Sequence, residues 1–183
     1  MSTFGIVILV IAIVVVVAAV MVVVAARRRS ALRERFGSEY DRTVEAAGSR
    51  RSADRELRDR VDERSSFEIR SLPAVARNQY EQSWRDVQAQ FVDAPKVALS
   101  EADLLVTRLM RDLGYPIDDF DHQADLLSVD HSDVVNNYRD GHQTYLQVTN
   151  GQGTTETMRR GFLAYRSLFA ELLDDGAEIE ATR

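Results

Sequence analysis

The sequence contains no cysteine among its 183 residues, which excludes disulfide bonds and thiolate metal sites. It also lacks any stretch in which polar and apolar residues alternate over the length of a strand, and no long internal repeat is visible. No catalytic motif stands out, and histidine occurs only three times. The lack of alternating stretches favours an all-α protein. Because no catalytic motif is found, we expect neither enzymatic activity nor a cofactor.

The longest apolar stretch runs from Phe4 to Ala26 and contains no charged residue and no proline. A helix of this length spans roughly 34 Å, enough to cross a bilayer core of about 30 Å. A cleaved secretory signal is the alternative, but it requires a positive n-region, a shorter apolar core and a small-residue cleavage site. The stretch lacks these features and ends at three arginines. The sequence therefore predicts a retained transmembrane helix.

Basic residues flank this span on one side only. Residues 1–3 carry the α-amino group alone, whereas the span is followed by Arg27, Arg28, Arg29, Arg33 and Arg35. Because arginine and lysine are retained on the cytoplasmic side, we expect the N-terminus outside the cell membrane and the C-terminal domain in the cytoplasm. The same five arginines could also bind anionic lipid headgroups. Both interpretations, topology alone or headgroup binding, stay open.

Small residues recur every seven positions along the span, at Gly5, Ala12, Ala19 and Ala26. This spacing places them on one side of a helix that is otherwise bulky, where a second helix could approach closely. A homodimer contact is one interpretation. The other is that alanine is ordinary apolar filler, because the span has no pair of glycines four residues apart.

The charge of the chain changes sign along its length. Residues 27–70 contain 13 basic and 10 acidic residues, whereas residues 71–183 contain 10 basic and 19 acidic residues. A basic segment suits the neighbourhood of anionic lipid, and an acidic domain argues against nucleic-acid binding. The predicted organisation is a short extracytoplasmic N-terminus (1–3), a transmembrane helix (4–26), a basic helical neck (27–70), a helical bundle domain (71–174) and a disordered tail (175–183).

The neck contains two predicted helices. An apolar stripe at Leu32, Phe36, Tyr40 and Val44 indicates a helix that continues the transmembrane one until Gly48-Ser49 breaks it. A second helix, which is highly charged, is expected from an N-cap at Ser52 to Phe67. It has little apolar surface. We therefore interpret it as a largely solvated spacer, with a partner-binding surface as the alternative.

Beyond residue 70, apolar stripes with helical spacing predict an antiparallel bundle of four main helices and one short one. The predicted helices cover residues 73–91, 95–113, 118–127 (the short one), 130–149 and 154–173. The helix 95–113 has the widest apolar face and ends at Gly114, so it is expected at the centre of the bundle. Trp84, the only tryptophan, lies on an apolar stripe and is interpreted as a packing residue.

Candidate chemical groups gather in one part of the bundle. They are Asp118, Asp119, Asp121, His122, Asp125, Asp130, His131 and His142. Carboxylates and imidazoles can bind a divalent metal or act as acid and base. On one continuous helix, however, His131 and His142 would lie about 16 Å apart, too far to share an ion. We therefore interpret Asp130 as a helix cap and His142 as a hydrogen-bonded core residue, and assign no metal ligand.

Four stretches after the span, in order, resemble an uncharacterised bacterial family. They are LRERFGSEYDRTV (Leu32–Val44), FVDAPKVALSEADLLVTRLMRDLGYP (Phe91–Pro116), LLSVDHSDVVNNYR (Leu126–Arg139) and YRSLFAELL (Tyr165–Leu173). The family looks most familiar from actinobacteria, and its single-span members are usually labelled hypothetical or secreted proteins. The resemblance implies no activity. A secreted location would conflict with the orientation that the arginines predict.

Three classes of function follow, in order of preference. The first is a single-pass membrane protein whose cytoplasmic bundle acts as an adaptor or scaffold, through a protein partner or a second copy of the chain. The second is a module that binds anionic lipid through its arginine-rich neck. The third is a metal-binding or hydrolytic domain that uses the group from Asp118 to His142.

Overall fold

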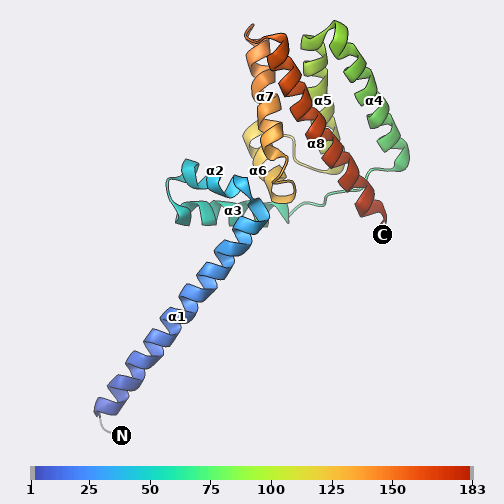
Figure 1. Ribbon diagram of the computed structural model, residues 1–183. Coiled ribbons are helices and arrows are strands. Elements are labelled where there is room, and N and C mark those ends of the chain that lie inside the picture. Colours follow the sequence, from blue (N-terminus) through green and yellow to red (C-terminus); the bar gives the residue numbers. More distant parts are fainter. Residues whose placement is uncertain (1–2, 182–183) are drawn as a thin grey trace. The chain divides into compact units, whose positions relative to one another are not determined.

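The computed structural model describes the backbone of residues 3–181 and the side chains of residues 11–174. Within this part every regular element is helical, which confirms the predicted all-α class (Figure 1). The helices are α1 (Thr3–Phe36), α2 (Ser38–Ala47), α3 (Arg50–Arg64), α4 (Ala74–Asp93), α5 (Pro95–Leu113), α6 (Phe120–Asp130), α7 (Val135–Thr149) and α8 (Thr155–Ala181). The chain divides into two compact units, Met1–Leu57 and Arg58–Arg183, and each is described by itself.

In the first unit, α1 is long and apolar enough to cross a membrane, judged by its length and composition. The valine and isoleucine side chains that the structure describes in this helix are exposed. As predicted, α1 continues past the apolar span, but it ends at Phe36. Gly37 has a φ of 49°, a left-handed conformation that favours glycine, and α2 begins directly after it. The predicted stripe from Leu32 to Val44 is therefore divided between two helices.

Gly48 ends α2, as the sequence predicted, and it has a left-handed conformation with a φ of 68°. The next helix begins two residues later, at Arg50. The backbone amide of Ser52 donates a hydrogen bond to the hydroxyl of Ser49 at 3.2 Å. The prediction of Ser52 as the N-cap is thus wrong by three residues, because Ser49 offers the same hydroxyl one turn earlier.

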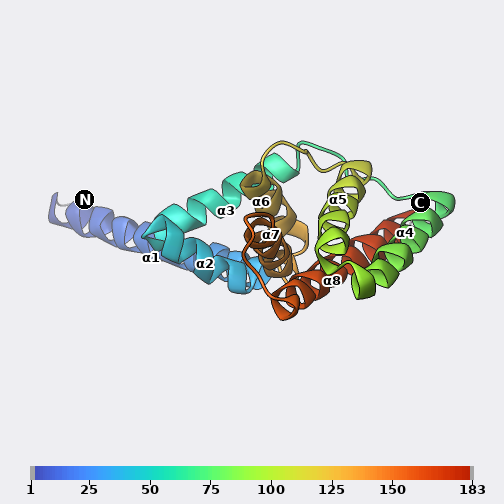
Figure 2. The same ribbon diagram turned by 90° about the horizontal axis from the view of Figure 1, so that it is seen from above.

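The second unit contains the predicted bundle, with α5 at its centre. Helix α5 packs against α4, α7 and α8, and Figure 2 shows it between α4 and α7, with α8 along one side. Its buried residues are Ala98, Leu99, Ala102, Leu105, Val106, Leu109, Met110 and Leu113. Gly114 follows with a φ of 100°, and the amide of Tyr115 donates to the carbonyl of Met110 at 2.9 Å. This glycine C-cap confirms the predicted helix end.

Aromatic rings connect α4 to α8. The Trp84 ring stacks on Phe162 and Phe169, with centroid distances of 5.2 Å and 4.6 Å. Phe91 lies 4.8 Å from Phe162 by the same measure. We call these four residues the aromatic core. Trp84 is 7% exposed, which confirms that it is a packing residue.

Glycines bring α7 and α8 close together. A Cβ atom at Gly161 of α8 would lie 2.6 Å from the Thr144 side chain of α7, and one at Gly141 would meet the Tyr165 ring at 3.0 Å. Beyond the packed region, α8 continues to Ala181, into the segment 175–183 for which the sequence predicted disorder. Alanine and glutamate there favour continuation of a helix, and residues 182–183 lie outside the described residues.

Candidate functional site

The three histidines predicted as candidate ligands lie in separate surroundings. His122 lies in the first turn of α6, where its Nδ1 faces an Asp118 carboxylate oxygen and its Nε2 lies 2.9 Å from Glu63 Oε1. The hydrogen bond to Asp118 raises the pKa of His122 above its ordinary 6.5, and the same bond lowers the pKa of Asp118. Because both ring nitrogens face carboxylates, the arrangement suits a protonated imidazolium that donates two hydrogen bonds.

Asp118, Asp119 and His122 carry ligand-type atoms that all lie within 4.8 Å of one another. Asp119, however, is the N-cap of α6, and its Oδ1 accepts a hydrogen bond from the His122 amide at 2.9 Å. An ion bound by these three residues would have to displace two hydrogen bonds, the one between Asp118 and the His122 ring and the one from the His122 amide to Asp119. The existing geometry is explained by capping and by the imidazolium contact.

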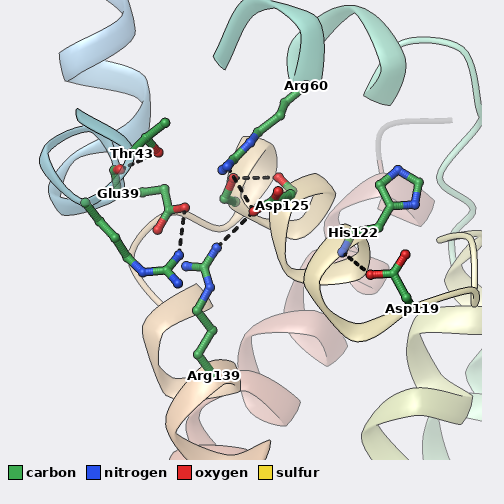
Figure 3. Close-up of polar contacts among 9 residues, drawn as sticks. Glu39, Thr43, Arg60, Asp119, His122, Asp125 and Arg139 are labelled. Carbon is green, nitrogen blue, oxygen red and sulfur yellow. Dashed lines mark hydrogen bonds and ion pairs between the residues drawn. The ribbon is translucent and has the colours of Figure 1, made fainter. Parts of the chain in front are cut away.

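The end of α3 contacts α6 through charged side chains. Arg60 Nη2 lies 3.0 Å from Asp125 Oδ1, and Arg139 Nη2 of α7 lies 3.2 Å from the same oxygen (Figure 3). Arg64 pairs with Asp130, which also accepts a hydrogen bond from the Tyr115 hydroxyl. Together with the pair of Glu63 and His122, these contacts form what we call the ion-pair seam: Arg60, Glu63 and Arg64 of α3, and His122, Asp125 and Asp130 of α6.

The seam corrects two predictions. Asp130 is the last residue of α6 and not the cap of the next helix, because α6 continues past Ser128 and α7 begins at Val135. The solvated-spacer interpretation also fails for the end of α3, where Arg60 is 9% exposed. The sequence contained no signal for this contact, since its members look like ordinary solvated charges.

His142 is held by a carboxylate that the sequence analysis did not single out. Its Nδ1 lies 3.2 Å from Asp103 Oδ1 on α5, and its ring stacks on Phe120 at 3.8 Å. The Tyr165 hydroxyl of α8 donates to the same Asp103 oxygen. Burial raises the pKa of Tyr165, and the neighbouring carboxylate raises it further. The predicted hydrogen bond of His142 is present, but the residue is half-buried, with its side chain 21% exposed, and does not belong to the core.

A signal for Asp103 was present in the sequence. It lies four residues after Leu99, three before Val106 and seven before Met110, all of which are fully buried. An acid on such a face requires polar partners, which α7 and α8 supply. His131, the third histidine, is the C-cap residue of α6 and is buried, with its Nδ1 4.0 Å from Glu171. His131 and His142 therefore do not share one helix, contrary to the prediction.

The arginines after the span have different surroundings. Arg29 Nε lies 3.2 Å from Asp54 Oδ2, and the other oxygen of Asp54 accepts a hydrogen bond from the buried Tyr40 hydroxyl at 2.8 Å. Arg33 lies over the Tyr40 ring, 5.0 Å from its centroid. Arg29 and Arg33 therefore also hold α1, α2 and α3 together. By contrast, Arg27 and Arg28 form no ion pair with any other residue whose side chain is described.

The structure describes the side chains of only part of the predicted packing face of the span. Ala12, Ala19 and Ala26 are exposed along α1, as are the bulky residues beside them. The fourth member, Gly5, is outside the residues whose side chains are described. The predicted helix contact through this face stays a prediction.

A groove between α4 and α8 was not foreseen. Its volume is about 290 Å³, and we call it the α4–α8 groove. Trp84, Phe169 and Leu173 form its apolar floor, although all three belong to the core and are at most 7% exposed. The rest of its lining is Arg77, Glu81, Arg85, Arg166, Ala170 and Asp174. A second groove, of about 550 Å³, lies between α7 and α8 and is lined mainly by polar residues such as Asp140, Gln143 and Arg160.

No family model, curated protein or solved structure matches this chain. The resemblance to an uncharacterised bacterial family therefore stays a prediction.

Proposed function

We propose that this chain is a single-pass membrane protein whose helical bundle acts as an adaptor through protein contacts. The observation that carries the proposal is the α4–α8 groove, a hollow of about 290 Å³ between two helices whose floor is formed by the accessible edges of core residues. Grooves of this kind accept amphipathic helices of partner proteins. The apolar α1 would keep the bundle at a membrane, and the arginines after the span favour a cytoplasmic location for it.

The use of the polar side chains supports this proposal. Asp125 and Asp130 connect α3 to α6, and Asp103 connects α5 to α7 and α8. These carboxylates act as links between helices and are engaged by arginine, tyrosine or histidine. The groove, in contrast, has exposed side chains at its rim, those of Arg85, Arg166 and Ala170.

The experiment is crosslinking of the full chain in native membranes through a C-terminal tag, with protease accessibility of the tag scored on intact cells from the same culture. We expect a protected tag and a discrete crosslinked partner. A tag that is cleaved from outside would overturn the proposed orientation. A protected tag without any crosslinked species would overturn the adaptor proposal.

A second candidate function is binding of anionic lipid by the neck. The observation in its favour is that Arg27 and Arg28 directly follow the apolar stretch and form no ion pair with another described side chain. Each could contribute about 1 kcal/mol near an anionic surface. In bicelles that contain both lipids, the full chain should then restrict the motion of phosphatidylglycerol more than that of phosphatidylcholine. The preference should fall in Arg27→Gln/Arg28→Gln and with salt, and an unchanged preference would exclude this role.

A further inference from the structure

The α4–α8 groove has a charge polarity that follows from the register of its helices. Arg77 of α4 pairs with Asp174 of α8 at 3.3 Å, and Trp84 stacks on Phe169. These contacts show that the two helices are antiparallel. Arg85 lies eight residues after Arg77 and Arg166 lies eight residues before Asp174, so both line the groove about two turns from this pair.

The two ends of the groove differ in how far their charges are neutralised. At one end, Arg77 is paired with both Glu81 and Asp174. At the other end, Arg85 shares Glu81 at 3.9 Å. Arg166 is exposed and forms no ion pair with any side chain among residues 11–174. The groove thus combines an apolar floor with one cationic end, although residues 71–183 as a whole are acidic.

We infer that the α4–α8 groove binds an amphipathic helix of a partner protein, with aliphatic side chains against Ala170 and the accessible edges of Trp84 and Phe169, and a carboxylate at Arg85 and Arg166. This inference rests on the proposed adaptor function and names the chemistry of the partner. Two antiparallel helices form a trough, into which a third helix can lay one apolar face. The cationic end requires an acidic flank on that helix, so charge complementarity selects both the partner and its direction.

The probe is a pair of model helices of about four turns, without tryptophan or tyrosine. Both have leucine at positions i, i+3, i+4 and i+7, and the flanking residues are glutamate in one peptide and lysine in the other. The full chain is held in nanodiscs of neutral phosphatidylcholine. Trp84, the only tryptophan, lies in the groove, so its emission reports occupancy directly.

We expect the glutamate peptide to change Trp84 emission saturably and the lysine peptide to bind at least about tenfold more weakly. Arg166→Glu should weaken the glutamate peptide about tenfold and strengthen the lysine peptide, since a charge at the contact is reversed. The matched control is Arg160→Glu, an exposed arginine of the same helix that lines the α7–α8 groove. It should leave both affinities unchanged.

Equal affinity for the two peptides, or an equal loss in Arg160→Glu and Arg166→Glu, would overturn the inference. A Trp84 response to phosphatidylglycerol vesicles without a response to either peptide would overturn it in favour of a lipid surface. Dimerisation that depends on Arg166, measured by sedimentation, would overturn it in favour of a second copy. If the peptides fail but a partner is still crosslinked at another face, the adaptor function stands and only the groove assignment fails.

Discussion

The contact between α4 and α8 and the contact between α3 and α6 lie in the same compact unit, but they are built from different side chains. The aromatic core joins α4 to α8 by ring stacking and apolar burial. The ion-pair seam joins α3 to α6 through arginine, glutamate, histidine and aspartate. Apolar burial has no titrating group and is not screened by salt, whereas paired charges titrate and are screened. The two regions should therefore respond differently to the same perturbation.

The largest effect is expected in the aromatic core. Phe162→Ala should lower the free energy of unfolding by about 3 to 5 kcal/mol, because it removes a buried ring that Trp84 and Phe91 contact and leaves a cavity. Leu163→Ala is the matched control, since Leu163 is the next residue of α8 and is 42% exposed. Urea denaturation of the full chain in micelles measures both. A loss below about 0.5 kcal/mol for Phe162→Ala would show that this helix face is wrong.

A smaller but still large effect is expected in the ion-pair seam. Asp125→Ala should cost about 2 to 3 kcal/mol, because it removes a charged hydrogen-bond acceptor that two largely buried guanidinium groups, those of Arg60 and Arg139, share. Asp121→Ala, an exposed acid of the same helix, should cost about 0.5 kcal/mol or less. Equal losses for the two substitutions would mean that the seam is a surface contact with little energetic weight.

An intermediate case is the polar contact inside the apolar bundle. Tyr165→Phe removes the hydroxyl that donates to Asp103 but keeps the ring, so we expect a loss of about 1 to 2 kcal/mol. The remaining partner of Asp103 is His142, and its imidazole NMR signals should shift in the variant. Tyr145→Phe, a half-buried tyrosine beside the same imidazole, should change stability by less than about 0.5 kcal/mol. An equal loss of stability in the two variants would show that the hydrogen bond between Tyr165 and Asp103 contributes no measurable stability.

The smallest effect is the pH dependence of the seam through His122. The hydrogen bond to Asp118 raises the pKa of the folded state above 6.5, so this contribution is fully present below about pH 6.5 and is lost as pH rises through the raised pKa. Asp118 has a lowered pKa, so its contribution is lost at the acidic end, as pH falls below its ordinary 3.8. Melting temperature should therefore fall between pH 6 and 9 more in the native chain than in His122→Gln. Parallel curves would contradict the imidazolium assignment.

The comparison also shows which features the sequence could predict. Apolar stripes with helical spacing predicted α5 and α8, and Gly114 marked a helix end, because burial and backbone conformation leave a local pattern. The buried position of Trp84 and the hydrogen bond of His142 followed from the same stripes, although His142 is half-buried and lies outside the core.

The ion-pair seam could not be predicted in this way. Arg60 and Asp125 lie on segments that are each highly charged, and a charge that is buried by a distant partner looks like a solvated one in the sequence. The close approach at Gly161 and the α4–α8 groove depend on how whole helices pack, which no local pattern encodes. Asp103 is the exception, since its position among buried residues of α5 was readable.

Photo-crosslinking shows whether the bundle binds a partner through the α4–α8 groove. A photoreactive amino acid is placed at Ala170, in the groove, or at Ala164, which lines the α7–α8 groove on the same helix. In native membranes, we expect a crosslink from position 170 only, lost in Arg166→Glu, to a helical segment with aliphatic residues beside a glutamate or aspartate. Equal crosslinking from both positions, or a crosslink at 170 that persists in Arg166→Glu, would contradict binding through this groove.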